Sequence, residues 1–120
     1  MTAEALLPWP PSVLNPNVHP HYQVRARAVK KYRQTCGWAC KAAGLVAPAT
    51  GDIHVWMDYH QPDLRRRDED NMQASVKAAL DGLADALNVN DNRFRLHPFF
   101  SDRVVIGGRI KIRITAGPTP

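Results

Sequence analysis

The chain has 120 residues, enough for one hydrophobic core but not for two, so a single domain is expected over residues 1–120. Its 44% hydrophobic and 22% charged residues are ordinary for a globular protein and argue against disorder. No apolar run approaches the ~20 residues that span a bilayer, and no signal-peptide pattern follows Met1. We therefore expect a soluble protein of the cytoplasm that does not contact a membrane.

Positive and negative charges are segregated along the chain. The formal net charge is +5, and no acidic residue occurs between Ala5 and Gly51. That span holds the basic residues Arg25, Arg27, Lys30, Lys31, Arg33 and Lys41. The acids gather mainly between Asp52 and Asp91. This arrangement is typical of a polyanion-binding surface beside a separate chemical site, although a solvated basic face that aids solubility gives the same pattern.

The first half of the chain predicts an edge strand followed by a long helix. A short apolar run opens LLPWPPSVLNP at 6–16, and its prolines confine it to the edge or the end of a sheet. Apolar residues then recur at three- and four-residue spacing from about Tyr22 to Ala43, with Gly44 as a stop. Cys36 and Cys40 lie on this stripe and are interpreted as small buried residues, since a zinc site lacks a second ligand pair at the usual spacing.

The second half predicts a strand, a second helix and two further strands. Residues 53–60 alternate in polarity and indicate a strand, and a helix with an apolar stripe begins near residues 68–70 and runs to Leu87. Residues 103–115, RVVIGGRIKIRIT, predict two strands broken near Gly107-Gly108, and the tail at 116–120 is expected to be frayed. The order β-α-β-α-β-β predicts an α+β domain, a mixed β-sheet with two main helices packed on it.

Three aspartates are candidate metal ligands. Asp68 and Asp70 straddle the start of the second helix, and Asp91 follows that helix in the loop NVNDN. Mg²⁺ prefers oxygen ligands and takes one or two carboxylates together with water and phosphate oxygens, so these residues would suit phosphodiester hydrolysis. Asp68 is equally a good N-cap, and acids in a first turn are favoured by the helix dipole without any further role.

Lys77 is a candidate partner for these acids. It lies seven residues after Asp70, about two turns along the same helix face, and a long side chain that leans toward the N-terminus would approach the carboxylates. There it would neutralise charge that develops on a phosphate or a leaving oxygen. The alternative is an ion pair on the helix surface with Asp81, one turn further on.

Two groups of basic residues are candidates for DNA binding. Three arginines, Arg65, Arg66 and Arg67, directly precede the acids. The guanidinium group of arginine can donate two parallel hydrogen bonds to one phosphate. Ion pairs within RRRDED are the competing interpretation, but exposed pairs stabilise by only ~0–1 kcal/mol. Arg27, Lys30 and Lys31 lie mostly off the apolar stripe of the first helix and should face water or a ligand.

Several motifs together resemble the RusA family of Holliday junction resolvases, which is common in bacteria and their phages and fits a phage or prophage origin. The motifs are LPWPPS at 7–12, PDLRRRDEDNMQ at 62–73, NDN at 90–92 and the ending GGRIKIRIT. The resemblance implies that Asp68, Asp70 and Asp91 bind Mg²⁺, for which Mn²⁺ can substitute. It also implies a homodimer whose two sites place paired nicks across a four-way DNA junction, with the three arginines on the DNA.

Two departures from the family pattern leave alternatives open. The family's catalytic lysine usually follows the second aspartate by four residues, where this chain has Ala74. Either Lys77 substitutes for it from one turn further away, or catalysis lacks that ammonium group and is slower. The acid pair of the third motif is reduced to Asn90-Asp91. The leading hypothesis is a Mg²⁺-dependent endonuclease for branched DNA in recombination or repair. The alternatives are a catalytically weak or silent junction-binding protein and a basic scaffold or RNA-binding protein.

Overall fold

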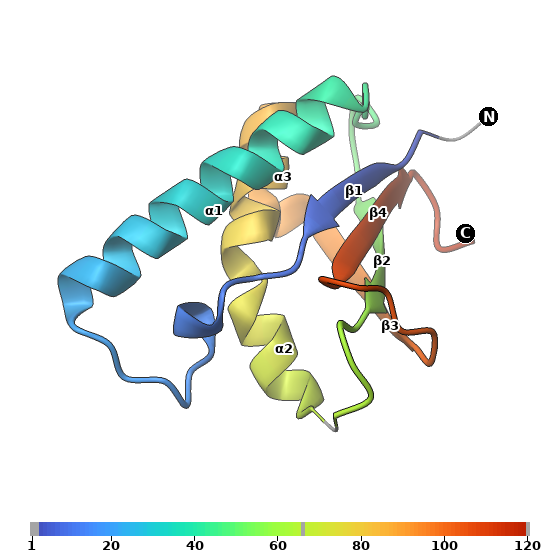
Figure 1. Cartoon of the computed structure of the whole chain (residues 1–120). Coiled ribbons are helices and arrows are strands. Elements are labelled where there is room, and N and C mark those ends of the chain that lie inside the picture. The colour runs from blue at the N-terminus through green and yellow to red at the C-terminus, as the bar shows by residue number, and fades with distance from the viewer. Residues whose placement is uncertain (1–2, 66, 120) are drawn as a thin grey trace.

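The computed structural model describes residues 3–65 and 67–119, which form a four-stranded sheet with its helices on one face (Figure 1). The strands are β1 (Ala5–Pro8), β2 (Ile53–His60), β3 (Phe94–Ser101) and β4 (Arg109–Thr115). The helices are α1 (Tyr22–Ala42), α2 (Glu69–Ser75) and α3 (Lys77–Leu87), with short 3₁₀ turns η1 (Ser12–Leu14) and η2 (Asp91–Arg93). The predicted α+β class and the order of its elements are confirmed. Within the part that the structure describes, no helix is long and apolar enough to cross a bilayer.

The sheet has the strand order β1-β4-β2-β3. β1 and β2 both run antiparallel to β4, while β3 runs parallel to β2, with Ile53 opposite Phe94. A parallel pair needs a crossover connection, which α2 and α3 provide. In consequence, the loop that leaves the carboxyl end of β2 and the turn that enters the amino end of β3 belong to opposite ends of these two strands.

The core lies between the sheet and the helices. Ile53, Val55, Met57 and Tyr59 are buried on the helix side of β2, as the alternation in the sequence predicts. Tyr32, Cys36 and Cys40 of α1 and Leu83 of α3 pack in the same cluster. The opposite face of the sheet is not covered by helices (Figure 1) and carries Trp56 stacked on His97, with ring centroids 3.9 Å apart.

Two predicted elements differ from the structure. The second helix is broken at Val76 (φ −95°, ψ 3°), so that Lys77 begins a new helix instead of continuing the first. The strand expected at the start of 103–115 is wrong: β3 is Phe94–Ser101, and residues 102–108 form a loop. Pro98 is tolerated in β3 because this strand pairs only with β2 and lies at the edge of the sheet.

The buried cysteines and tyrosines predict a loss of stability in alkaline solution. Burial raises the pKa of Cys36 to about 12 and that of Cys40 to about 11, and it also raises the pKa of Tyr32 and Tyr59. The folded protein therefore keeps protons that the unfolded chain releases above about pH 9, so stability is full below that value and falls as the pH rises past it.

Urea unfolding at a series of pH values checks this expectation. The urea concentration at the midpoint should fall progressively above about pH 9. The midpoint of Cys40→Ala should fall less steeply, because this variant lacks one of the buried groups with a raised pKa. Alkylation of the native protein should leave both thiols unmodified near neutral pH and modify both after denaturation. A midpoint that does not change up to about pH 10, near the ordinary tyrosine pKa, would contradict the expectation.

Candidate active site

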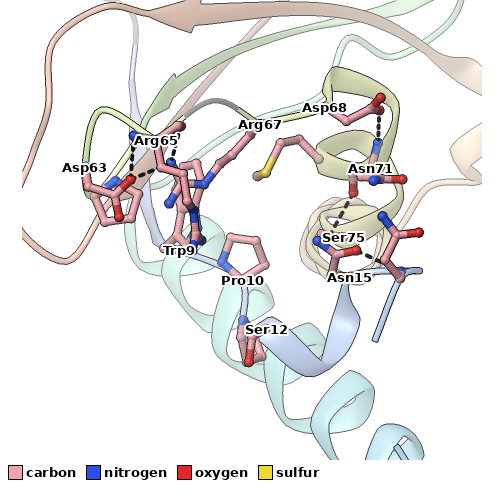
Figure 2. A pocket seen from close by; sticks show the side chains of 14 residues that line it. Trp9, Pro10, Ser12, Asn15, Asp63, Arg65, Arg67, Asp68, Asn71 and Ser75 are labelled. Atoms are coloured by element: carbon pink, nitrogen blue, oxygen red, sulfur yellow. Dashed lines mark hydrogen bonds and ion pairs between the residues drawn. The ribbon is translucent and has the colours of Figure 1, made fainter. Parts of the chain in front are cut away.

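Residues 9–17 and residues 62–75, which include the RRRDEDN motif, enclose a pocket of about 530 Å³ (Figure 2). One wall comes from residues 9–17, between β1 and α1, and the other from residues 62–75, which leave β2 and enter α2. Hydrogen bonds fix the first wall on α1. The hydroxyl of Tyr32 donates to the Pro8 carbonyl at 2.6 Å, and Arg25 donates to the Val13 carbonyl at 2.8 Å. Side chains of α1 thus hold the backbone of the first wall in place.

Arg67 organises the second wall. Its side chain is only 12% exposed, and Nη1 donates to Gln61 Oε1 at 2.8 Å, to Asp63 Oδ1 at 3.0 Å and to the Arg65 carbonyl at 3.0 Å. The guanidinium also lies 5.7 Å from the centroid of the Trp9 ring. These contacts hold the loop after β2 against the N-terminal segment. Arg67 therefore has a structural role in addition to the predicted DNA contact, which stays a prediction.

Asp63 is a residue of this loop that the sequence analysis missed. Its carboxylate accepts hydrogen bonds from the Arg67 side chain and from the Arg65 backbone N–H, and these lower the pKa of Asp63. The signal in the sequence is an aspartate four residues before an arginine, directly after Pro62. Arg65 itself is exposed at the pocket, whereas the predicted contact of Arg66 lies outside the described residues.

Asp68 and Asp70 lie at the start of α2. Asp68 is the N-cap, since its Oδ1 accepts a hydrogen bond from the Asn71 N–H at 3.0 Å, and it lines the pocket (Figure 2). Capping uses one lone pair of one oxygen, so the Asp68 carboxylate keeps further acceptor capacity. Asp70 lies exposed in the first turn. The Asp68 carboxylate therefore has the capacity to cap the helix and to bind a metal ion at the same time.

Asp91 and Lys77 line a different pocket, together with Ala74 and Phe94. Asp91 opens η2, just before β3, whereas Asp68 caps α2 and lines the pocket between residues 9–17 and 62–75. Lys77 is 72% exposed, and its Nζ lies 3.6 Å from Asp81 Oδ1, so the surface ion pair is present.

The three predicted ligands are therefore not gathered at one point. Within residues 3–65 and 67–119, no three His, Cys, Asp or Glu side chains are placed to hold a metal ion together. The donor chemistry nevertheless fits a hard cation, because Asp68 and Asp70 present exposed carboxylates from one helix start, and Mg²⁺ needs only one or two of them. The assignment of the three aspartates stays a prediction.

The predicted basic face of α1 is exposed. Arg27, Lys30 and Lys31 lie on the side of this helix that faces away from the core, and none of them has an ion pair among the residues that the structure describes. Arg33 behaves differently, since it forms a two-hydrogen-bond ion pair with Asp85 of α3 at 2.7 and 2.8 Å. These three cations of α1 are thus open to an anionic partner.

No protein-family model matches the chain, but individual proteins do. An uncharacterized protein of Xylella fastidiosa is 38% identical over 116 residues, which cover 91% of this chain and 73% of that protein. The crossover junction endodeoxyribonuclease RusA of Escherichia coli K12 is 33% identical over 123 residues, which cover 95% of this chain and 94% of that protein. The chain belongs to the RusA family. A RusA of Enterobacteria phage 82 is 32% identical with the same coverage, so the family includes phage members.

The similarity to RusA is not confined to the arginine–aspartate motif. A match that covers 95% of the chain leaves few residues outside it, so it extends over both walls of the pocket as well as the segment of Asp91. The departure at Ala74 concerns one exposed position on α2 within this larger similarity.

Proposed function

We propose that this RusA-family protein is a Mg²⁺-dependent endodeoxyribonuclease that resolves four-way DNA junctions by paired symmetric nicks in recombination or repair. It would act in the cytoplasm as a homodimer, because two symmetric cuts require two sites related by a two-fold axis. The observation that carries the proposal is the similarity to RusA over 95% of the chain. Exposed acids beside an anchored, arginine-bearing loop support it.

The residues divide the work between binding and chemistry. Arg65 and the three α1 cations would bind backbone phosphates, and Arg67 would hold the loop that presents Arg65. Asp68, Asp70 and Asp91 would hold the divalent cation. When bound, this cation activates the attacking water and stabilises the leaving oxygen.

A catalytically weak or silent junction-binding protein is the second candidate. Ala74 occupies the position of the family lysine, and Lys77 pairs with Asp81 at 3.6 Å. Exposed pairs of this kind are weak, so Lys77 would be able to leave Asp81 for a phosphate when DNA is bound. The two candidates differ only in whether the bound junction is cut.

Cleavage of an end-labelled, mobile four-way junction in Mg²⁺, beside a linear duplex of the same sequence, tests both candidates. We expect paired nicks in the junction alone, and binding that weakens steeply with salt because phosphate contacts release counterions. Tight binding without products in Mg²⁺ or Mn²⁺ would identify the silent protein. Equal binding of junction, linear DNA and RNA would refute the proposal in favour of a nonspecific basic protein.

A further inference from the structure

Most side chains that line the pocket between residues 9–17 and 62–75 are neutral, and the four charged ones are two arginines and two aspartates. Figure 2 shows Trp9, Arg65 and Arg67 on one side, Asn15 and Asn71 on the other, and Pro10 and Ser12 between them. Asp63 and Asp68 also line it. The two arginines are matched by the two aspartates, so the lining offers a phosphate no excess of positive charge. The interior suits a flat, uncharged group that makes hydrogen bonds.

Several polar groups of this pocket have spare hydrogen-bonding capacity. Within the described residues, neither the Ser12 hydroxyl nor the Asn71 amide has a partner, because the bonds of Asn71 run through its backbone N–H and carbonyl. Asn15 uses its Oδ1 to accept from the Asn17 N–H at 2.8 Å and keeps its amide donors. Asparagine amides pair with the donor and acceptor edges of nucleobases.

We propose that this pocket takes one unstacked nucleotide of the branched DNA, next to the phosphate that is cut. The inference rests on the proposed function and adds a substrate contact to it. The volume of about 530 Å³ lies in the range of pockets that hold small organic ligands. Pro10, Pro11 and Met72 offer apolar surface for the faces of a base, and the amides and Ser12 reach its edge. Enzymes that unstack a base read it in this way.

The position of the pocket explains why a junction would be preferred over a duplex. Asp68 lines it and also starts α2, so an inserted nucleotide would bring its own phosphate to the predicted metal ligands and to Arg65. Unstacking costs most in a regular duplex and least where a base is already poorly stacked or single-stranded. The branch point of a four-way junction offers such bases. The pocket would thus couple recognition of the branch to placement of the phosphate.

The test uses junctions that carry 2-aminopurine at one branch-point position at a time, with no divalent cation present. Binding of the wild-type protein should raise the fluorescence of one position, because the probe brightens when it is unstacked. Ser12→Tyr fills the pocket without removing a hydrogen bond of the described residues. Ser12→Ala leaves the space open, and Thr50→Tyr places the same side chain on an exposed loop far along the chain.

Ser12→Tyr should abolish the fluorescence rise and lower the nicking rate in Mg²⁺ by more than about 10-fold, while junction affinity changes by less than about 3-fold because phosphate contacts dominate it. Thr50→Tyr should behave like the wild type in fluorescence, and Ser12→Ala, which loses one hydrogen bond to the base but leaves the space open, should keep a smaller rise. A bound junction without any responsive position, or a full rise with Ser12→Tyr, would overturn the pocket proposal while leaving the nuclease intact. A wild-type protein that does not bind junctions would refute the proposed function, and this inference with it.

Discussion

Replacing Gly82 by alanine is expected to destabilise the protein by more than about 3 kcal/mol, as strong overpacking of a core does. A Cβ at this position would lie 2.4 Å from the Arg33 carbonyl oxygen and 2.8 Å from the Gly37 nitrogen. Both are backbone atoms of α1, held by the hydrogen bonds of that helix, so they cannot turn aside as a side chain would. The two helices would have to move apart and open the core around Cys36 and Leu83.

Urea and thermal unfolding measure this effect, with two matched variants. Gly117→Ala should change stability by less than about 0.5 kcal/mol, because nothing lies within 4 Å of its added Cβ. The loss of stability in Gly37→Ala should lie between those of Gly82→Ala and Gly117→Ala, since its Cβ would meet the Gly82 carbonyl oxygen at 3.2 Å. A Gly82→Ala protein as stable as the wild type would show that α1 and α3 are not packed backbone to backbone at this point.

The elements that the sequence predicts correctly are those whose pattern is local. The period-two alternation of 53–60 identifies β2, and the four-residue spacing of Tyr32, Cys36 and Cys40 identifies the buried stripe of α1. Each pattern follows from one face meeting the core, and that is visible within a single segment. The helix break at Val76 escapes the pattern because the apolar stripe continues through it.

The features that the sequence did not predict depend on contacts between distant segments. β3 is held in the sheet by its parallel pairing with β2. Its sequence shows no alternation of apolar and polar residues, because its burial pattern is irregular. The role of Arg67 depends on Trp9, which lies far away in the sequence, and on a loop that folds back through Asp63. For the same reason, the RRRDEDN motif predicts a chemistry for the candidate site but not the distance from Asp91 to the other acids.

Exchange of the candidate ligands for asparagine is expected to have the largest effect on activity. Asp68→Asn, Asp70→Asn and Asp91→Asn should each lower junction nicking by more than about 100-fold, because a ligand charge is lost at the metal, while junction binding is retained. Asparagine caps a helix about as well as aspartate, so Asp68→Asn removes the charge without the loss of about 1 kcal/mol that Asp68→Ala would add. Asp102→Asn, at an exposed loop position, is the matched control and should nick like the wild type.

The pattern among the three variants decides how the site is assembled. Full nicking by Asp70→Asn would refute its role as an essential ligand. If Asp91→Asn alone is as active as the wild type, the chemistry belongs to the start of α2, where Asp68 and Asp70 lie together, and the pocket of Asp91 and Lys77 has another role. If all three are inactive but fold and bind the junction, Asp91 must approach the other two acids in the DNA-bound protein. The comparison of melting temperatures with nicking rates separates both results from a loss of folding.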